Sequence, residues 1–453
     1  MLAGGWCDQQ ANFVPRPFAP RPYRRCTVRI LLTGGSGFLG SRLVRALATA
    51  GHEVVCALRQ PRRAVERELP CRPIAADLAR DVRADDWKPR LVGVEVVVNA
   101  AGILRESPGQ RFDALHTAGP CALFEACAAV GVRRVVQISA LGADAAARSR
   151  YHLSKKAADD FLLGLPLSAV VVQPSLIYGV GGTSARLFTL LASLPLIPLP
   201  GKGDQAVQPV HVGDAVAAIV ALVQGDAFRG ERVALVGPRP LLLRELLGEL
   251  RGAMGLGPPH FLPVPLPLVR IGAALGEHLP GSLLDRDTLR MLERGNTAPA
   301  TATAALLGRA PRPAAAFVEP AQQAGARALA MLAWLLPLLR WSVAAVWIVT
   351  GILSLGLYPV ADSYALLARV GVGPAWAPLA LYGAALLDLA LGVGILLLQR
   401  RRWLWIAQIV LMLGYTAIIT WRLPEYWLHP FGPILKNLPL LAALGLLLAF
   451  EKK

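Results

Sequence analysis

The sequence predicts an α/β Rossmann fold, a doubly wound parallel sheet, followed by a transmembrane domain. The first ~300 residues alternate strand-like and helical patterns, whereas the last ~115 are almost continuously apolar. A T-G-x-x-G-x-x-G motif runs from Thr33 to Gly40, between the first expected strand and the first expected helix. The chain is 54% hydrophobic and 17% charged, against about 25% charged residues in typical soluble proteins.

The net charge of +17 does not indicate a nucleic-acid partner. The basic residues are mostly scattered arginines, without a basic stripe interleaved with aromatic residues. We therefore expect no nucleic-acid binding. The six cysteines lack metal-ligand spacing and predict reduced thiols and no metal site: Cys7, Cys26, Cys56, Cys71, Cys121 and Cys127.

Four parts are predicted along the chain. Residues 1–27 contain no apolar core of signal-peptide length and are expected to be a disordered extension, with a translation start at Val28 as the alternative. Residues 28–308 are expected to form the nucleotide-binding domain. Residues 309–327, rich in Ala, Pro and Arg, predict a linker. Residues 328–453 predict a four-helix membrane domain.

The order of elements within the first domain predicts its topology. Strands are expected at residues 28–33, 53–58, 94–99, 135–139, 169–173 and 232–236, with helices between most of them and the first helix over 41–50. This alternation favours a parallel sheet covered on both faces and joined by right-handed crossovers. From about 240 onward, proline-broken helices predict a small helical subdomain on the substrate side.

One segment of this subdomain, residues 262–275, is apolar but too short and too interrupted to span a bilayer. We expect it to form a packed wall of the subdomain. The alternative is a surface that enters the membrane interface.

The glycine motif has the context that a dinucleotide site requires, directly after a strand and at the start of a helix. Gly34 permits a tight turn, Gly37 lets the backbone approach a pyrophosphate, and Gly40 allows close packing of helix on strand. The helix N-terminus at Phe38 and Leu39 is expected to face the phosphates. The motif therefore predicts a nicotinamide cofactor.

The residue after the second strand indicates which cofactor binds. NAD sites usually place an acid there to hold the ribose 2′-hydroxyl, but this sequence has Arg59, followed by Arg62 and Arg63. A guanidinium suits a 2′-phosphate, so we expect NADP(H) in preference to NAD(H), which stays the second possibility. Arg59 could instead be a solvated strand end.

Other small or acidic residues follow the next strands. Asp77 and Leu78 are placed to contact the adenine, with the Asp77 carboxylate near the amino group. Ala100, Ala101 and Gly102 follow a further strand, where small side chains let the cofactor lie along the backbone.

These motifs, with Ser139, Tyr151-x-x-x-Lys155 and Pro174-Ser175, resemble the extended and atypical short-chain dehydrogenase/reductases from Val28 to about Pro311. That superfamily includes nucleoside-diphosphate-sugar epimerase-like proteins and relatives of the complex I NAD(P)-binding accessory subunit. The motif set is highly specific for the superfamily and weakly specific for substrate. The resemblance implies that Pro174 also contacts the cofactor.

The resemblance assigns the catalytic roles. Tyr151 would be the general acid/base, and Lys155, on the same helix face, would lower the tyrosine pKa and hold the nicotinamide ribose. Ser139 would bond to the substrate oxygen. His116 stands where many relatives have Asn, and Ala140 where many have a second hydroxyl residue. Asp214 is expected to be structural, as a helix cap.

Four apolar segments predict membrane spans, over residues 341–358, 378–398, 403–421 and 434–450, and 328–339 looks interfacial or pre-helical. The loop and last segment from His429 to Pro439 resemble the DoxX-like family. Most flanking basic residues fall on one side of a four-span arrangement: Arg327, Arg340, Arg400, Arg401, Arg402, Lys452 and Lys453. The positive-inside rule then places both termini and the nucleotide domain in the cytoplasm of an inner membrane.

Asp388 lies inside the second expected span and is a functional candidate, paired with Lys436 or His429. A protonated carboxyl or a hydrogen bond between helices is the equal alternative.

The expected function is NADP(H)-dependent oxidation or reduction of a hydrophobic or membrane-derived carbonyl or alcohol, such as a quinone or lipid. The expected partners are the lipid bilayer and that small hydrophobic substrate. One alternative is a non-catalytic scaffold or assembly factor that associates with respiratory-chain components. A nucleotide-sugar epimerase is the second alternative, although the missing acid after the second strand disfavours it.

Overall fold

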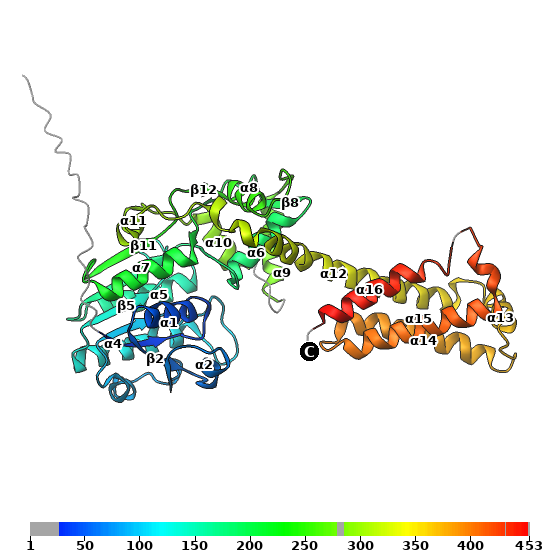
Figure 1. Cartoon of the computed structure of the whole chain (residues 1–453), viewed down its shortest axis with the longest axis horizontal. Helices are drawn as coiled ribbons and strands as arrows, with labels where there is room; N and C mark the ends of the chain where they lie inside the picture. Colours follow the sequence, from blue (N-terminus) through cyan, green and yellow to red (C-terminus); the bar gives the residue numbers. More distant parts are fainter. Residues whose placement is uncertain (1–26, 279–284, 431, 452–453) are drawn as a thin grey trace, which may run out of the picture. The chain divides into compact units, whose positions relative to one another are not determined.

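The computed structural model describes residues 27–278, 285–430 and 432–451. The expected N-terminal extension therefore lies outside the described residues, except for Thr27. The chain divides into two compact units, which meet between Arg327 and Ala328 and are described separately below (Figure 1).

The first unit is built on a seven-stranded parallel sheet with the order β11-β6-β5-β4-β1-β2-β3. The order reverses direction beside β1, as in other doubly wound folds, so the predicted fold class is confirmed. The strands are β1 (Arg29–Thr33), β2 (Glu53–Leu58), β3 (Arg72–Ala75), β4 (Val96–Asn99), β5 (Arg134–Ile138), β6 (Ala169–Pro174) and β11 (Glu231–Leu235).

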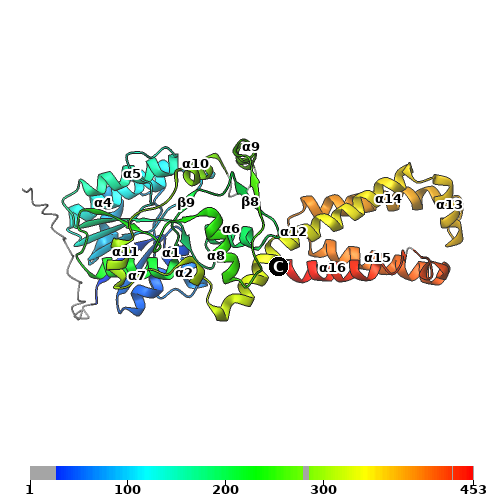
Figure 2. The same cartoon turned by 90° about the horizontal axis from the view of Figure 1, so that it is seen from above.

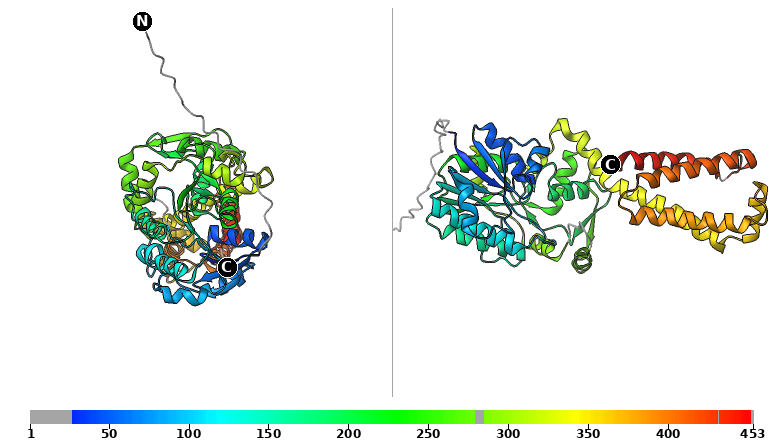
Figure 3. Two further views of the ribbon diagram at one scale, coloured as in Figure 1. Left: turned by 90° about the vertical axis from the view of Figure 1, so that its left-hand side faces the viewer. Right: turned by 90° about the horizontal axis from the view of Figure 1, so that it is seen from below.

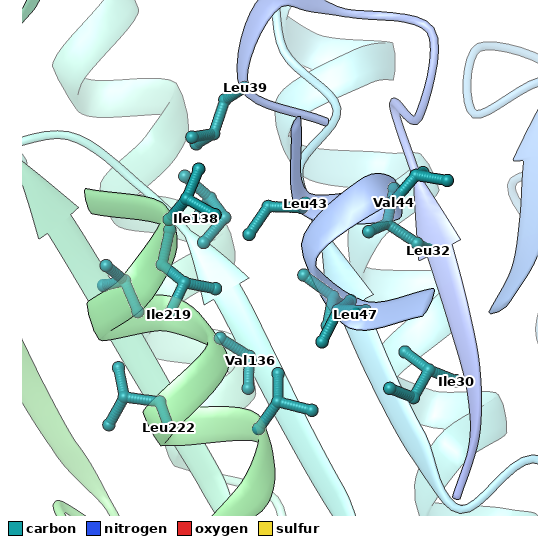
Figure 4. Packing of buried hydrophobic residues seen from close by; sticks show 14 of the residues in the cluster. Ile30, Leu32, Leu39, Leu43, Val44, Leu47, Val136, Ile138, Ile219 and Leu222 are labelled. Carbon is teal, nitrogen blue, oxygen red and sulfur yellow. The ribbon is translucent and has the colours of Figure 1, made fainter. Parts of the chain in front are cut away.

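Helices cover both faces of this sheet because alternate residues of each buried strand point to opposite sides (Figures 1 and 3). One face packs against α1 (Phe38–Thr49), α7 (Val212–Gln224) and α11 (Thr301–Leu307). Figure 4 shows the core on this side, where Leu43 and Leu47 of α1 and Ile219 and Leu222 of α7 meet the strands.

The opposite face packs against α3 (Ala84–Trp87), the 3-10 turn η1 (Lys88–Leu91), α4 (Gly119–Val130) and α5 (Arg150–Leu163). Helix α2 (Arg62–Glu66) follows β2, and a π-helical segment, η2 (Asp113–Ala118), leads into α4. The carboxyl ends of β1, β2 and β4 all point toward one edge, where ligands bind in such sheets.

The substrate-side subdomain consists of short strand pairs and helices. Parallel pairs form between β7 (Ile177–Tyr178) and β10 (Val210–His211) and between β8 (Ile197–Pro200) and β13 (Phe261–Val264). An antiparallel pair joins β9 (Ala206–Val207) to β12 (Leu241–Leu242). The helices are α6 (Thr183–Ser193), α8 (Leu243–Ala253), α9 (Leu266–Gly276) and α10 (Arg286–Arg294). The subdomain therefore begins earlier in the chain than expected and contains strands as well as helices.

The predicted linker packs on the first unit. Asp214, fully buried in the first turn of α7, accepts hydrogen bonds from the Arg309 guanidinium at 2.6 Å and from the backbone N–H of Arg312 at 2.8 Å. Phe317 stacks on Tyr178 at 4.9 Å between ring centroids. The prediction that Asp214 caps a helix is wrong, because the N-cap of α7 is His211. Asp214 instead anchors the segment after α11.

The second unit contains most of α12 (Gln323–Ile352) and the apolar helices α14 (Ala377–Leu397), α15 (Arg402–Arg422) and α16 (Asn437–Phe450). Helix α12 lies beside α14, and α15 lies beside α16 (Figures 1 and 2). Three spans in the described chain are long and apolar enough to cross a membrane, Pro320–Leu357, Ala377–Leu397 and Arg402–Arg422. Helix α16 has 14 residues, fewer than the ~20 that a span needs, so the fourth span stays a prediction.

The stretch expected to be interfacial forms part of continuous α12, with Pro337 inside the helix. The remaining elements are the turns η3 (Ala314–Ala316), η4 (Pro320–Gln322), η5 (Leu353–Leu357) and η6 (Pro424–Trp427) and helix α13 (Val360–Arg369). At one end of the bundle, Glu451 accepts hydrogen bonds from Arg340 at 3.3 Å and from the Trp405 indole at 3.1 Å. Arg401 lies 3.8 Å from the same carboxylate, so two of the arginines predicted on one side are brought together.

The centre of the bundle combines close backbone packing with buried polar groups. A Cβ on Gly351 would lie 2.8 Å from the Ala385 carbonyl oxygen, so α12 and α14 approach closely there. The buried Trp347 indole donates to the Gln408 amide oxygen at 2.8 Å. Asp388 is 7% exposed, and its Oδ1 has no hydrogen-bond partner in the part of the chain that the structure describes. The structure thus shows no bond from Lys436 or His429 to that atom.

Candidate active site

The glycine turn is built by backbone contacts that exclude larger residues. Gly34 has a φ of +70°, and a Cβ at this position would lie 2.6 Å from the Ala100 carbonyl oxygen. A Cβ on Gly40 would lie 2.1 Å from the Gly34 carbonyl oxygen. The turn between β1 and α1 therefore presses against the loop after β4, and only glycine permits this contact.

A pocket of about 230 Å³ lies at the carboxyl ends of the strands around this turn. It contains eight of the residues predicted to bind the cofactor: Gly34, Gly37, Arg59, Asp77, Leu78, Ala100, Ala101 and Gly102. The other predicted residues lie around it. Leu39 lies in the core, and the Phe38 ring lies under the Arg42 guanidinium. Gly40 packs on Gly34, and Pro174 pairs with Leu235 in the sheet.

Positive charge gathers at the end of β2. Arg59 and Arg63 both line the pocket, and the side-chain amide of Gln110 lies against the Arg59 guanidinium. Among the described residues that line the pocket, the one carboxylate is Asp77, which follows β3 and accepts the backbone N–H of Ala79 at 3.1 Å. Arg63, from α2, adds to the charge predicted from Arg59.

Lys155 is positioned by the ends of two strands. Its amine donates to the carbonyl oxygens of Ile138 at 3.1 Å and of Ala101 at 3.3 Å, and it lies 3.1 Å from where a Cβ of Gly102 would be. Burial lowers the pKa of Lys155 to about 8, and the nearby Asp159 carboxyl opposes this shift. An ammonium has three donors, so one remains for a ribose hydroxyl beside the pocket.

Tyr151 lies one turn before Lys155 on α5 and is surrounded by aromatic rings. Its ring lies edge-on to His116, with 5.6 Å between centroids, and contacts Phe112 and His152. Burial is the main cause that raises the pKa of Tyr151 to about 12, and the Asp159 charge adds to it. The phenol is therefore protonated at neutral pH.

His116 organises this side of the site. Its Nε2 accepts the backbone N–H of Ile103 at 3.0 Å, and its Nδ1 lies 2.9 Å from the Ser154 hydroxyl. Ser154 donates its own proton to the Tyr151 carbonyl oxygen at 2.8 Å, so Nδ1 must be the protonated nitrogen. Burial and the Lys155 charge lower the pKa of His116 to about 2, so the ring is neutral.

Ser139 directly follows β5, and its bond to a substrate oxygen stays a prediction. Its hydroxyl donates to the carboxylate of Asp159, a fully buried residue on α5. The side-chain amide of Gln137 donates a hydrogen bond to the same carboxylate at 3.4 Å. Gln137 in turn accepts a hydrogen bond from the Asn99 side chain at 2.7 Å, and Asn99 accepts one from the Thr33 hydroxyl. Ser139 is therefore part of a polar chain that links β1, β4 and β5 to α5.

Sequence reasoning missed Asp159, although a signal was present. Asp159 lies four residues after Lys155 and eight after Tyr151, on the face of α5 that packs against the sheet. Burial raises the pKa of Asp159 to about 6, while hydrogen bonds and the Lys155 charge lower it by less. A carboxyl on this face needs partners, and Ser139 and Gln137 supply them.

A second, apolar cavity of about 430 Å³ lies in the substrate-side subdomain. Its lining includes Leu187 and Phe188 of α6, Leu247 of α8, and Val269 and Gly272 of α9. Ile103 lines the nucleotide pocket and the next residue, Leu104, lines this cavity. The two spaces therefore adjoin at the loop after β4, on the side where His116 and Tyr151 lie.

The fold and the nucleotide pocket define the class of protein: an NAD(P)-binding Rossmann protein of the oxidoreductase type. Residues 30–237 match the NAD dependent epimerase/dehydratase family, and residues 344–445 match the DoxX-like family. The chain belongs to the NAD dependent epimerase/dehydratase family and carries a DoxX-like domain after it.

Curated relatives include a ceramide reductase from Caulobacter vibrioides, 35% identical over 199 residues, which are 42% of this chain and 60% of that protein. Subunit 9 of the mitochondrial NADH dehydrogenase (ubiquinone) 1 alpha subcomplex of Arabidopsis thaliana is 30% identical, over 53% of this chain and 61% of that one. A 3-diazoavenalumate denitrifying reductase from a Streptomyces species is 30% identical, over 53% of this chain and 86% of that one. The chain thus spans about three fifths of the length of the first two.

Proposed function

We propose that this chain is a membrane-anchored, NADP(H)-dependent oxidoreductase that reduces the carbonyl group of a hydrophobic, membrane-derived molecule, or oxidises the corresponding alcohol. The observation that carries this proposal is an apolar cavity near the nucleotide pocket: Ile103 lines the pocket, and the next residue, Leu104, lines the cavity. A substrate whose alkyl part fills the cavity would place its polar end near Tyr151 and Lys155.

The chain's residues suit the reductive direction. A bound nicotinamide would supply a hydride to the substrate carbon, and Lys155 and the Gly34 turn would hold that cofactor. Tyr151 would donate its phenolic proton to the substrate oxygen as the carbonyl becomes an alcohol, which matches its protonated state. The Lys155 ammonium would stabilise the phenolate that remains. The Ser139 hydroxyl donates its proton to Asp159, so this mechanism assigns it no proton to donate to the substrate oxygen.

The preference for NADP(H) rests on Arg59 and Arg63. Both side chains line the pocket at the end of β2, where no carboxylate among the lining residues of β2 would repel a 2′-phosphate. Guanidinium groups bind phosphate oxygens with two parallel hydrogen bonds. NAD(H) would lack this contact and bind more weakly.

The proposed substrate and location follow from the membrane part and from one relative. The DoxX-like match and the apolar helices support an anchor that keeps the nucleotide domain at a membrane. The relative from Caulobacter vibrioides is, by its name, a ceramide reductase, and this supports a lipid carbonyl as the substrate here. We place the nucleotide domain in the cytoplasm, at an inner membrane, because Arg340 and Arg401 lie at one end of the bundle.

Turnover by the detergent-purified full chain tests the proposal. NADPH oxidation should accompany reduction of long-chain ketones, and Tyr151→Phe should lower kcat by at least ~100-fold while NADPH binding persists. Tyr178→Phe is the matched control, because that hydroxyl bonds to Thr189 away from the nucleotide pocket. Absence of turnover of any carbonyl or alcohol with either nicotinamide, or full activity in Tyr151→Phe, contradicts the proposal.

Cofactor preference has its own test. Arg59→Asp should raise the Kd for NADPH by more than tenfold, because only NADPH carries the 2′-phosphate, and should lower the Kd for NADH, because an acid at this position can hold the ribose 2′-hydroxyl. Arg62→Asp is the control, since Arg62 lies on α2 but does not line the pocket. Equal weakening of both nucleotides would show that Arg59 does not read the phosphate.

A second candidate is a non-catalytic, nucleotide-bound scaffold for a respiratory complex. The Ser139–Asp159 bond favours it, because it leaves Tyr151 without the hydroxyl partner expected on β5. The relative in the NADH dehydrogenase complex points the same way. Permanently bound nucleotide, together with unimpaired cell function in Tyr151→Phe and co-purifying respiratory subunits, would establish this candidate over the enzyme.

A further inference from the structure

Helix α9 presents an apolar face to the outside of the nucleotide unit. Leu268, Ile271 and Leu275 are 58%, 57% and 63% exposed, and their spacing places them on one face of the helix. Only Ala273 and Gly276 of α9 are buried. The packed wall expected for this segment is therefore only half correct: one side is packed, and the other carries large uncovered side chains.

The inner side of the same helix forms part of the apolar cavity. Val269 and Gly272 line it, together with Leu289 and Leu292 of α10. Helix α9 also follows β13 directly and stands at the periphery of the unit, beyond β8 and β13 (Figure 2). Helix α9, with 11 residues, thus contributes both to the cavity lining and to the exposed surface.

We propose that α9 lies in the headgroup region of the bilayer and admits the alkyl chain of the substrate from the lipid into the apolar cavity. The proposed membrane contact follows from the exposed apolar face of α9 and does not depend on the proposed function. The proposed entry of the substrate rests on the proposed function. An amphipathic helix of this kind buries its apolar face about 5–10 Å into the boundary between headgroups and acyl chains.

The chain itself favours a bilayer as the occupant of this face. Helix α12 begins the membrane-spanning part of the same chain, so lipid is always within reach of the nucleotide unit. The net charge of +17 attracts the chain to an anionic lipid surface. Helix α9 contains no acidic residue, and its one charged side chain, Arg270, bonds to Glu293 of α10 at 3.0 Å.

The membrane contact can be measured on the full chain reconstituted in phosphatidylcholine–phosphatidylglycerol nanodiscs. A spin label would be attached at Ile271→Cys, and at Val65→Cys as the control, since Val65 is 71% exposed on α2 at the nucleotide side. A background without the native reactive cysteines keeps the label at one site. The label at 271 should be accessible to oxygen and shielded from a water-soluble nickel chelate, and the label at 65 should show the reverse.

Equal access of the nickel chelate to both labels would overturn the membrane contact. So would strong dipolar broadening between labels at 271, because the occupant would then be a second copy of the chain. Substitution at this exposed position should leave the fold intact.

The entry route is tested by the triple variant Leu268→Gln, Ile271→Gln, Leu275→Gln. It should lower kcat/KM about tenfold for a long-chain ketone embedded in the nanodisc and leave a short, water-soluble ketone unaffected. Unchanged turnover of the embedded ketone would overturn the entry route. If no ketone is turned over by the wild-type chain but the label at 271 is buried in lipid, the proposed function fails and the membrane contact stands.

Discussion

The nucleotide pocket and the apolar cavity adjoin at Ile103 and Leu104, yet they are built in different ways. The pocket is lined mainly by short runs of residues at the ends of β1, β2, β3 and β4, and three of these residues, Gly34, Gly37 and Gly102, are glycines. The cavity is lined by side chains from α6, β8, α8, β13, α9 and α10, which are spread over more than a hundred residues. A backbone site tolerates few substitutions at its glycines, whereas a side-chain site can change its shape through single residues.

The largest effect should come from adding one methyl group to the nucleotide turn. In Gly40→Ala the new Cβ would lie 2.1 Å from the Gly34 carbonyl oxygen, so α1 must move away from β1. Such overpacking costs up to about 3 kcal/mol, or roughly 150-fold in the Kd for NADPH if it falls on the turn. Calorimetric titration of NADPH measures the change.

The control for this prediction is Gly252→Ala in α8, where a Cβ meets nothing within 4 Å. It should keep the Kd for NADPH and stabilise the chain slightly, because alanine favours a helix. A Gly40→Ala variant that binds NADPH as tightly as the wild type would show that the turn is not held by the Gly34–Gly40 contact.

A substitution in the cavity should change kcat/KM according to the length of the substrate's alkyl chain. A substitution in the nucleotide turn should affect short and long substrates equally. Gly272 lines the cavity, and a Cβ there has open space within 4 Å, so Gly272→Leu can grow into the cavity without a backbone clash. Excluding about three methylene groups of a substrate costs about 2.4 kcal/mol, or roughly 50-fold in kcat/KM for the longest ketones. Short ketones should keep their kcat/KM.

Gly252→Leu is the control for the change in helix propensity, because Gly252 lies on α8 away from the cavity lining. Equal loss for short and long ketones in Gly272→Leu would mean that the alkyl chain does not occupy this cavity. A loss shared by Gly252→Leu would point to a general effect on the subdomain.

The sequence predicted the backbone-built region more closely than the side-chain-built one, for a physical reason. The glycine motif, Arg59 and Asp77 each follow a strand, and strand ends in a parallel sheet meet at one edge, so short motifs define that pocket. The cavity depends on how six distant segments pack, and no single segment carries its pattern. The bond from Ser139 to Asp159 was not predicted, because Asp159 becomes a neighbour of Ser139 only once α5 is docked on the sheet.

His116 lies between the two regions and should make the chain sensitive to acid. Its pKa is about 2 in the folded chain and about 6.5 in an unfolded one, so the unfolded state binds more protons between these values. Stability must therefore fall as the pH drops below 6.5, by up to about 1.4 kcal/mol per pH unit. Asn at this position, the residue of many relatives, carries no titrating group.

Urea unfolding of the full chain in detergent between pH 7 and pH 5 checks this prediction. The wild type should lose stability on acidification more steeply than His116→Asn. Asp159 acts in the opposite sense, because its raised pKa means stability is lost as the pH rises toward 6, but it is present in both proteins and cancels in their difference. Parallel pH profiles would show that His116 is not held neutral.

The smallest effect is expected in the membrane part, which lies outside both regions of the site. Asp388 is buried, and its Oδ1 has no hydrogen-bond partner among the described residues. Replacing the carboxyl with an amide therefore breaks no hydrogen bond at that atom. Asp388→Asn should change the stability in detergent by less than about 1 kcal/mol and leave ketone reduction unchanged. Thermal unfolding and NADPH turnover measure both quantities. Loss of turnover in Asp388→Asn, with stability and NADPH binding retained, would give this buried carboxyl a part in the chemistry and would end the separation of an anchoring domain from a catalytic one.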